Sequence, residues 1–170
     1  MTPWPHTPQA FRFRCMGLRG GDQEDNFTTN PEEQRDAQIL KDSIANPQAP
    51  LKIGQSLDDY ASVEISKSGR FKYVLVQAKD SKGRVKHFVR GDIEHDYHVY
   101  CAKPLVDKLK DSGFETKVLG GGRMEHLPNQ KILQIFGYSH SFGMEDKSIT
   151  KDVCLRKFPG YYIETSESGY

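Results

Sequence analysis

Gly120-Gly-Gly-Arg-Met-Glu-His126 is the stretch around which the chain is organised, together with the loop Gly137-Tyr-Ser-His-Ser-Phe-Gly143. Predicted strands precede both stretches, and a predicted helix follows the second. Because glycine tolerates positive φ, consecutive backbone N–H groups can turn towards one oxyanion. The guanidinium of Arg123 adds a planar fork that matches phosphate or carboxylate. The two stretches therefore predict an anion-binding cradle, and we interpret the chain as an enzyme that handles phosphoryl groups.

Strand signals surround this cradle. Short segments rich in β-forming residues, or alternating in polarity, span residues 62–65, 71–77, 85–90, 114–119, 123–126, 131–136 and 161–165. Asp80-Ser-Lys-Gly83 has the composition of a hairpin turn between two of them. The glycines are expected to form a loop between two strands, since glycine interrupts strand patterns.

Two helices are predicted between the strands. The first spans about residues 96–111, where apolar residues repeat at helical spacing and Gly113 provides a stop. The second begins at Glu145 and Asp146 and ends at Pro159. Together the elements predict an α+β fold, a single mixed β-sheet of about six strands flanked by two helices.

Residues 1–57 lack sustained strand periodicity and predict a flexible, largely disordered N-terminal extension to a domain at residues 58–170. One segment of the extension, residues 30–44, carries helix signals. Asn30 can cap it, Pro31 suits its first position, and two glutamates suit the positive end of the helix dipole. Its apolar stripe is thin, and the sequence leaves open whether it packs on the domain or frays.

The charge balance gives no reason to expect a polyanionic partner. The chain has 24 basic and 23 acidic residues, a net charge of +1, so we expect binding neither to nucleic acid nor to a membrane. Cys15, Cys101 and Cys154 have no CxxC or metal-ligand spacing, which favours a reducing compartment and a cytoplasmic protein. The first 21 residues are basic and leave a transit peptide open, although three prolines argue against it.

Both glycine-rich stretches also have a purely structural interpretation. Three consecutive glycines often form a plain tight turn, although the adjacent Arg123 favours oxyanion binding. Ser139 and Ser141 flank His140 in a loop that leads to a helix N-terminus, where hydroxyl and N–H groups stabilise a dianion. The alternative is that both serines cap the helix.

His98 is the candidate catalytic histidine because it lies in the first turn of a predicted helix, where its side chain can project over the end of the sheet. His95 lies three residues before it, and His126, His140 and several carboxylates make a zinc site arithmetically possible. These residues lack any recognised zinc spacing, so we expect no metal and no cofactor.

Two other phosphatase chemistries lack their residues in this sequence. Neither Cys101 nor Cys154 is followed at the required distance by an arginine, and the aspartyl motif DxDx[TV] is absent. A phosphatase built from this chain would therefore work through histidine, arginine and backbone amides.

Several short motifs, taken together and in order, are more specific than any one of them. They are Gly69-Arg-Phe-Lys-Tyr-Val-Leu75, Val89-Arg-Gly91, Tyr97-His98, Leu119-Gly-Gly-Gly-Arg123, Lys131-Ile132, Gly137-Tyr-Ser139, Phe142-Gly143 and Gly169-Tyr170. In this order and near-family spacing, residues 60–170 resemble the small protein phosphohistidine phosphatases of the Janus/Ocnus family.

The resemblance implies metal-independent removal of phosphate from phosphohistidine in proteins. By the same resemblance, His98 is the catalytic histidine, Lys72 contacts the substrate and Arg123 is the arginine of the glycine stretch. Ser139, His140 and Ser141 match the loop that wraps the phosphate. The expected partner is a histidine-phosphorylated protein, phospholysine being a second substrate with the same P–N bond, and we expect a monomer.

Two questions stay open at this point. His98 can act as a general base, since an unperturbed imidazole with a pKa of about 6.5 is mostly deprotonated at pH 7, or it can attack phosphorus directly. The family also includes members known for roles in sex-specific germline biology, so a non-catalytic phosphoprotein-binding module is the alternative function. Because Lys72, His98 and Arg123 are all present, the sequence favours the enzyme.

Overall fold

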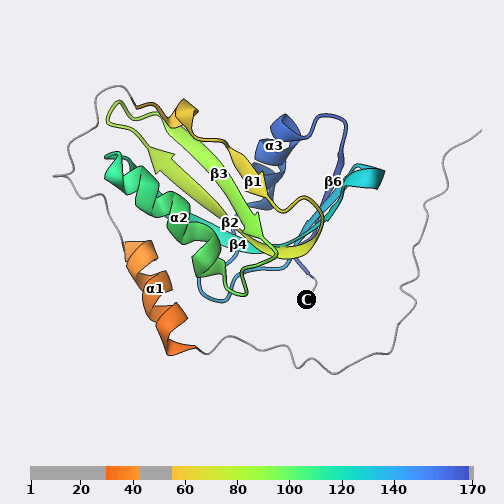
Figure 1. Ribbon diagram of the computed structural model, residues 1–170, viewed down its shortest axis with the longest axis horizontal. Coiled ribbons are helices and arrows are strands. Elements are labelled where there is room, and N and C mark those ends of the chain that lie inside the picture. Colours follow the sequence, from red (N-terminus) through yellow and green to blue (C-terminus); the bar gives the residue numbers. More distant parts are fainter. Residues whose placement is uncertain (1–29, 43–54, 169–170) are drawn as a thin grey trace, which may run out of the picture.

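A six-stranded sheet forms the centre of the computed structural model, which describes residues 30–42 and 55–168 (Figure 1). The strands are β1 (Val63–Ile65), β2 (Gly69–Lys79), β3 (Val85–Asp92), β4 (Glu115–Leu127), β5 (Ile132–Phe136) and β6 (Tyr162–Thr165). Their spatial order is β1-β3-β2-β4-β5-β6. The outer pairs β1–β3 and β5–β6 are parallel and the inner pairs are antiparallel, so the predicted mixed sheet is confirmed.

Helices cover both faces of this sheet. They are α1 (Pro31–Asp42), α2 (His98–Asp111) and α3 (Lys147–Lys157), with short 3-10 turns at Leu57–Asp59 and Pro128–Gln130. Figure 1 shows α1 beside α2, with α3 across the sheet. Alternation along β2 separates the two layers, since Val74 and Val76 join the apolar cluster under α2 whereas Tyr73 and Leu75 join the cluster under α3. The two predicted helices of the domain are thereby confirmed.

The third helix, α1, comes from the predicted extension and packs on the domain. Ala37 and Leu40 are 2% and 4% exposed and belong to the same apolar cluster as Val99 of α2. The helix that carries the thin apolar stripe therefore packs on the domain and does not fray. Residues 1–29 and 43–54, which carry the rest of the predicted extension and the transit-peptide alternative, lie outside the described residues, as does the motif at residues 169–170.

β4 runs without interruption through the three glycines, so the predicted strand–loop–strand arrangement was wrong. The register with β2 shifts between Leu75 and Val76, beside Gly120. A Cβ built on Gly122 would lie 2.5 Å from the carbonyl oxygen of Phe136, closer than real Cβ atoms approach. The glycines therefore let neighbouring backbones come together within a strand rather than make a turn.

Candidate functional site

Two cations project from neighbouring strands on the α2 face of the sheet. Lys72 on β2 lies directly opposite Arg123 on β4, and opposite residues of an antiparallel pair point to the same face. Burial, and then the charge of Arg123, lowers the pKa of the Lys72 ammonium. That ammonium donates to the main-chain carbonyl of Asp96 and lies 5.5 Å from the centre of the Tyr97 ring. Two like charges held this close favour an anion between them.

His98 is the first residue of α2, and its imidazole reaches across to β4. Its Nε2 lies 3.0 Å from the carbonyl oxygen of Gly122. Because a carbonyl only accepts, we assign the proton to Nε2, which leaves the lone pair on Nδ1. A Cβ on Gly121 would lie 3.2 Å from Cδ2 of His98 and 2.3 Å from the carbonyl oxygen of Tyr73. The ring therefore packs directly against the strand because residue 121 has no side chain.

The environment of His98 keeps its imidazole neutral. The side chain is 7% exposed, and its pKa is lowered to about 4, mainly by burial. The hydrogen bond to Gly122 opposes this shift, whereas the charges of Lys72 and Arg123 add to it. An imidazole with such a pKa is deprotonated throughout the physiological range and can accept a proton.

The loop at residues 137–143 closes on itself beside the two cations. Ser139 and Gly143 exchange backbone hydrogen bonds of 3.3 and 2.7 Å, and the buried hydroxyl of Ser139 accepts the amide of Phe142 at 3.2 Å. Ser141 donates its hydroxyl to a carboxylate of α1. The exposed ring of His140 lies against Tyr138, 5.2 Å between centroids. The two serines therefore differ, since one holds the loop together and the other makes contact outside it.

Neither serine caps α3. The N-cap of that helix is Asp146, whose carboxylate accepts the amide of Ser148 at 2.9 Å. The helix-capping alternative for Ser139 and Ser141 was therefore wrong.

The part of the predicted anion cradle that rested on a turn of the three glycines was also wrong. Gly120, Gly121 and Gly122 lie within β4, and the amide of Gly121 donates to the carbonyl of Gly143 at 3.2 Å. An N–H group that is paired in this way is not directed at a ligand. What the glycines position is the imidazole of His98 and the loop at residues 137–143. The structure brings together the predicted side chains Lys72, His98 and Arg123, with His140 and Ser141 of the loop near them. The predicted Ser139 instead accepts a hydrogen bond within the loop.

One residue of this site was missed by sequence reasoning. Glu33 of α1 is 2% exposed, and its Oε1 accepts the hydroxyl of Ser141 at 2.9 Å. Its charge also opposes the lowering of the Lys72 pKa by burial and by Arg123. The signal was present, because Glu33, Ala37 and Leu40 follow one another at i, i+4 and i+7 on one helix face. From the sequence alone, a glutamate in a first helical turn indicates only a favourable charge for the helix dipole.

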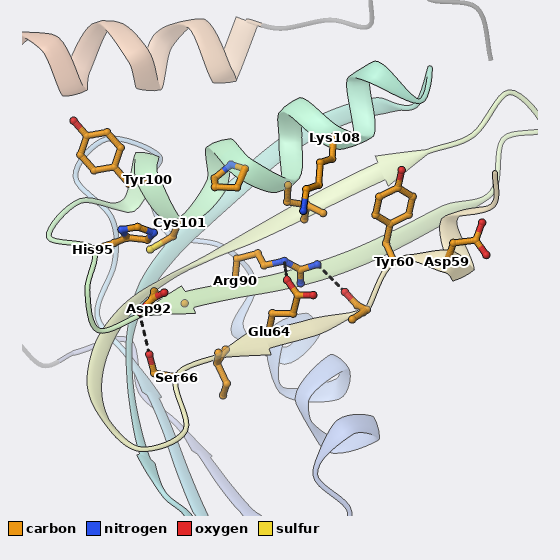
Figure 2. Close-up of a pocket in the computed structure, with 15 residues that line it drawn as sticks. Asp59, Tyr60, Glu64, Ser66, Arg90, Asp92, His95, Tyr100, Cys101 and Lys108 are labelled. Atoms are coloured by element: carbon orange, nitrogen blue, oxygen red, sulfur yellow. Dashed lines mark hydrogen bonds and ion pairs between the residues drawn. The ribbon is translucent and has the colours of Figure 1, made fainter. Parts of the chain in front are cut away.

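A separate hollow of about 480 Å³ lies between α2 and strands β1 and β3 (Figure 2). Arg90 lines it, but its guanidinium is occupied by the protein: it pairs with Glu64 at 3.1 Å and donates to the carbonyls of Ala61 and Val89. With these donors used, Arg90 ties β1 to β3. The hollow therefore offers weaker support for an anion site than the cluster around Lys72.

Within residues 30–42 and 55–168, no group of three or more metal-ligating side chains is found, and no helix is long and apolar enough to span a membrane.

The sequence of the chain is similar to that of a known protein family. The model of the Janus/Ocnus family matches residues 57–162. The sex-regulated protein janus-A of Drosophila yakuba is 40% identical over 108 residues, 64% of this chain and 80% of its own length. The janus-A protein of Drosophila pseudoobscura pseudoobscura is 36% identical over 121 residues, 68% of this chain and 81% of its own.

A third relative has a name that states a reaction. The 14 kDa phosphohistidine phosphatase of Sus scrofa is 29% identical over 114 residues, 64% of this chain and 90% of its own length. The matched segment of the chain contains strands β1 to β5 and all the site residues except Glu33, and it ends at the first residue of β6. The chain therefore belongs to the Janus/Ocnus family.

Proposed function

We propose that this protein hydrolyses the P–N bond of phosphohistidine in proteins, with His98 as the general base. The observation that carries the proposal is the neutral imidazole of His98, held by Gly122 beside the cations Lys72 and Arg123. The name of the pig relative supports the same reaction class, whereas the names of the janus-A relatives state no reaction.

The two cations suit the electrostatic part of this reaction. A phosphoryl group transferred from nitrogen to water carries its charge on three equatorial oxygens, and catalysis consists mainly of positioning and of stabilising that charge. Lys72 and Arg123 project from the same sheet face, and Ser141 can donate from the loop opposite. The expected role of these three residues is to hold the phosphoryl group.

The tautomer of His98 suits the proton transfer. With Nε2 donating to Gly122, Nδ1 accepts the proton of the attacking water while the P–N bond breaks. The electron pair of that bond stays on the substrate nitrogen, which takes up a proton from solvent, so that the substrate imidazole leaves neutral, and His98 returns its proton to solvent. A bound phosphoryl dianion is an opposite charge beside the ring, which raises the pKa of His98 above its value of about 4 in the free protein. Substrate binding would thus strengthen the base. Direct attack by Nδ1, with a phosphorylated His98 as intermediate, uses the same geometry.

The deciding experiment measures phosphate release from a histidine-phosphorylated protein by the native chain, His98→Ala and His95→Ala, with and without EDTA. His95 is the matched control because it lies three residues earlier and outside the cation cluster. We expect release by the native chain and His95→Ala, none by His98→Ala, and no effect of EDTA.

Each other outcome has a definite meaning. Full release by His98→Ala would contradict the site assignment, and EDTA-sensitive release would contradict a metal-free mechanism. No release from a folded native chain would favour the phosphoprotein-binding module. Phospholysine as a second substrate, a monomeric state and a cytoplasmic location are further parts of the proposal, to be checked with a phospholysine substrate, by light scattering and by microscopy of the tagged protein.

A further inference from the structure

The carboxylate of Glu33 lies among the groups that the proposed function assigns to the phosphoryl group. Its Oε1 accepts the hydroxyl of Ser141 at 2.9 Å, and its charge acts on the ammonium of Lys72. Its Oε2 is buried and has no hydrogen-bond partner among the described residues. A carboxylate is an oxyanion like a phosphoryl group, but it has one oxygen fewer and half the charge of a dianion.

Burial of this carboxylate is unusual for its position. A buried carboxylate is stable only where charge and hydrogen bonds compensate for the lost water. The adjacent Glu32 is exposed, as glutamates of a helix surface normally are. Glu33 instead shares the buried face of α1 with Ala37 and Leu40. The compensation that the structure shows is the hydrogen bond from Ser141 and the nearby charge of Lys72, both of which belong to the proposed phosphoryl site.

The attachment of α1 is slight enough to be reversed. Ala37 and Leu40 are its buried apolar side chains among the described residues, whereas Ile39 is 63% exposed. Two such side chains, one of them a single methyl group, contribute only a few kcal/mol of apolar burial, roughly 0.8 kcal/mol per CH₂. A ligand that binds the cations more tightly than Glu33 does can therefore displace the helix.

We propose that α1 is an autoinhibitory element whose Glu33 occupies part of the phosphoryl site, so that substrate and helix compete for Lys72 and Ser141. The inference rests on the anion-binding part of the proposed function. A phosphoryl dianion that uses more donors than one carboxylate displaces α1, and a partner that removes α1 raises the activity of the site. The helix is thus a regulator that the matched family segment, residues 57–162, does not contain.

The first test measures binding of inorganic phosphate to the full chain by calorimetry. Glu33→Ala removes the competing carboxylate, and Glu32→Ala is the matched control, since it removes the same charge from the same helix turn at an exposed position. We expect about tenfold tighter phosphate binding by Glu33→Ala, the size of one hydrogen bond to a charged group, and the native affinity for Glu32→Ala. Equal affinity in all three proteins would overturn the proposal, and absence of binding in all three would overturn both it and the anion site.

The second test follows amide hydrogen exchange of residues 33–41 in the native chain. If phosphate and α1 compete, saturating phosphate makes these amides exchange faster. Unchanged or slower exchange would contradict competition, whatever the variants do. Neither test depends on turnover, so a chain that behaves as expected here but releases no phosphate from phosphohistidine would refute the proposed reaction and leave the autoinhibitory helix intact.

Discussion

Two polar clusters lie on opposite faces of the sheet, one half-buried and one buried, and they differ in the charges that they contain. The open cluster (Lys72, His98 and Arg123) faces α1 and α2, and the carboxylate of Glu33 on the N-terminal helix contacts Ser141 and acts on the charge of Lys72. The closed cluster (Tyr73, Glu145, Lys147 and Thr150) faces α3 and contains its own charges. A cluster that contains both charges of its ion pair holds the parts of the domain together, even though Oε2 of Glu145 and Nζ of Lys147 have no hydrogen-bond partner among the described residues. A cluster with an excess of positive charge instead indicates an anion site.

The closed cluster fastens the end of the loop at residues 137–143 to the sheet. The hydroxyl of Tyr73 donates to Oε1 of Glu145, and burial, then the charge of that carboxylate, raises the pKa of Tyr73. Lys147 places its ammonium 3.6 Å from the same oxygen, and the two side chains are 7% and 0% exposed. The amide nitrogen of Glu145 lies so close to β4 that a Cβ on Gly120 would approach it to 2.5 Å.

The largest expected effect comes from breaking the closed cluster. Glu145→Ala leaves the buried Lys147 ammonium unpaired and Tyr73 without its acceptor, which should lower the free energy of unfolding by about 3–5 kcal/mol. Glu145→Gln keeps an acceptor for Tyr73 and should cost less. Lys72→Met, the counterpart in the open cluster, should cost under about 1 kcal/mol but weaken phosphate binding. Urea unfolding measures the effect of each variant on stability, and calorimetry measures its effect on phosphate binding. Equal destabilisation by Glu145→Ala and Lys72→Met would contradict the difference between the two clusters.

The next effect tests the strand that separates the clusters. Gly121→Ala forces a Cβ against the backbone of Tyr73 and the ring of His98, so we expect a loss of about 3 kcal/mol. Gly83→Ala is the matched control because Gly83 has a φ of +83° and open space around its Cβ position, where left-handed strain alone costs about 1–2 kcal/mol. Thermal unfolding measures both. A smaller loss for Gly121→Ala than for Gly83→Ala would contradict the close packing of His98 on β4.

The sheet and the domain helices could be predicted because their signals are local. The β-forming residues at 71–77 and the Asp80–Gly83 turn specify a hairpin, and the apolar spacing of residues 99–109 specifies α2. The glycine stretch could not be placed, because its meaning depends on what approaches it. Gly121 and Gly122 are required by contacts with Tyr73 and Phe136, which are distant in sequence. Local propensity predicts a turn for such a stretch, and the tertiary packing makes it a strand.

The candidate site likewise contains residues that the sequence predicts and one that it does not. Motif resemblance was enough to bring together Lys72, His98 and Arg123. The part played by Glu33 was not predictable, since it follows from the packing of α1, which a stripe of so few apolar residues does not specify. Whether a glutamate of a helix first turn faces solvent or a cation depends on where the helix lies.

The third prediction sharpens the description of the open cluster through pH. The pKa of His98 is lowered from 6.5 to about 4 in the folded protein, so between these values the unfolded chain binds more protons than the folded one. The contribution of His98 to the free energy of unfolding is therefore fully present above pH 6.5 and is lost as the pH falls towards 4. We expect a decrease of about 2 kcal/mol between pH 7 and pH 5 from His98 alone.

The matched variant for this prediction is His98→Gln, which keeps a donor for Gly122 but does not titrate. The free energy of unfolding is measured in urea at pH 5 and pH 7. Its decrease between pH 7 and pH 5 should be about 2 kcal/mol smaller in His98→Gln than in the native chain. An identical pH dependence would mean that His98 titrates normally and is exposed to water.

The smallest expected effect distinguishes the two serines of the loop at residues 137–143. Ser139→Ala leaves the buried amide of Phe142 without its acceptor, which should cost about 1 kcal/mol of stability. Ser141→Ala removes a donor that points to Glu33 and, in our proposal, to the phosphoryl group, so it should loosen α1 rather than lower the free energy of unfolding of the domain. In the Glu33→Ala background, where the helix carboxylate no longer competes, Ser141→Ala should weaken phosphate binding severalfold and Ser139→Ala should weaken it less.

Urea unfolding and calorimetry on the same samples measure the stability and the phosphate affinity of these serine variants. The reverse order would mean that Ser139, although it accepts within the loop, is the hydroxyl that contacts the ligand, and that Ser141 serves only to hold α1.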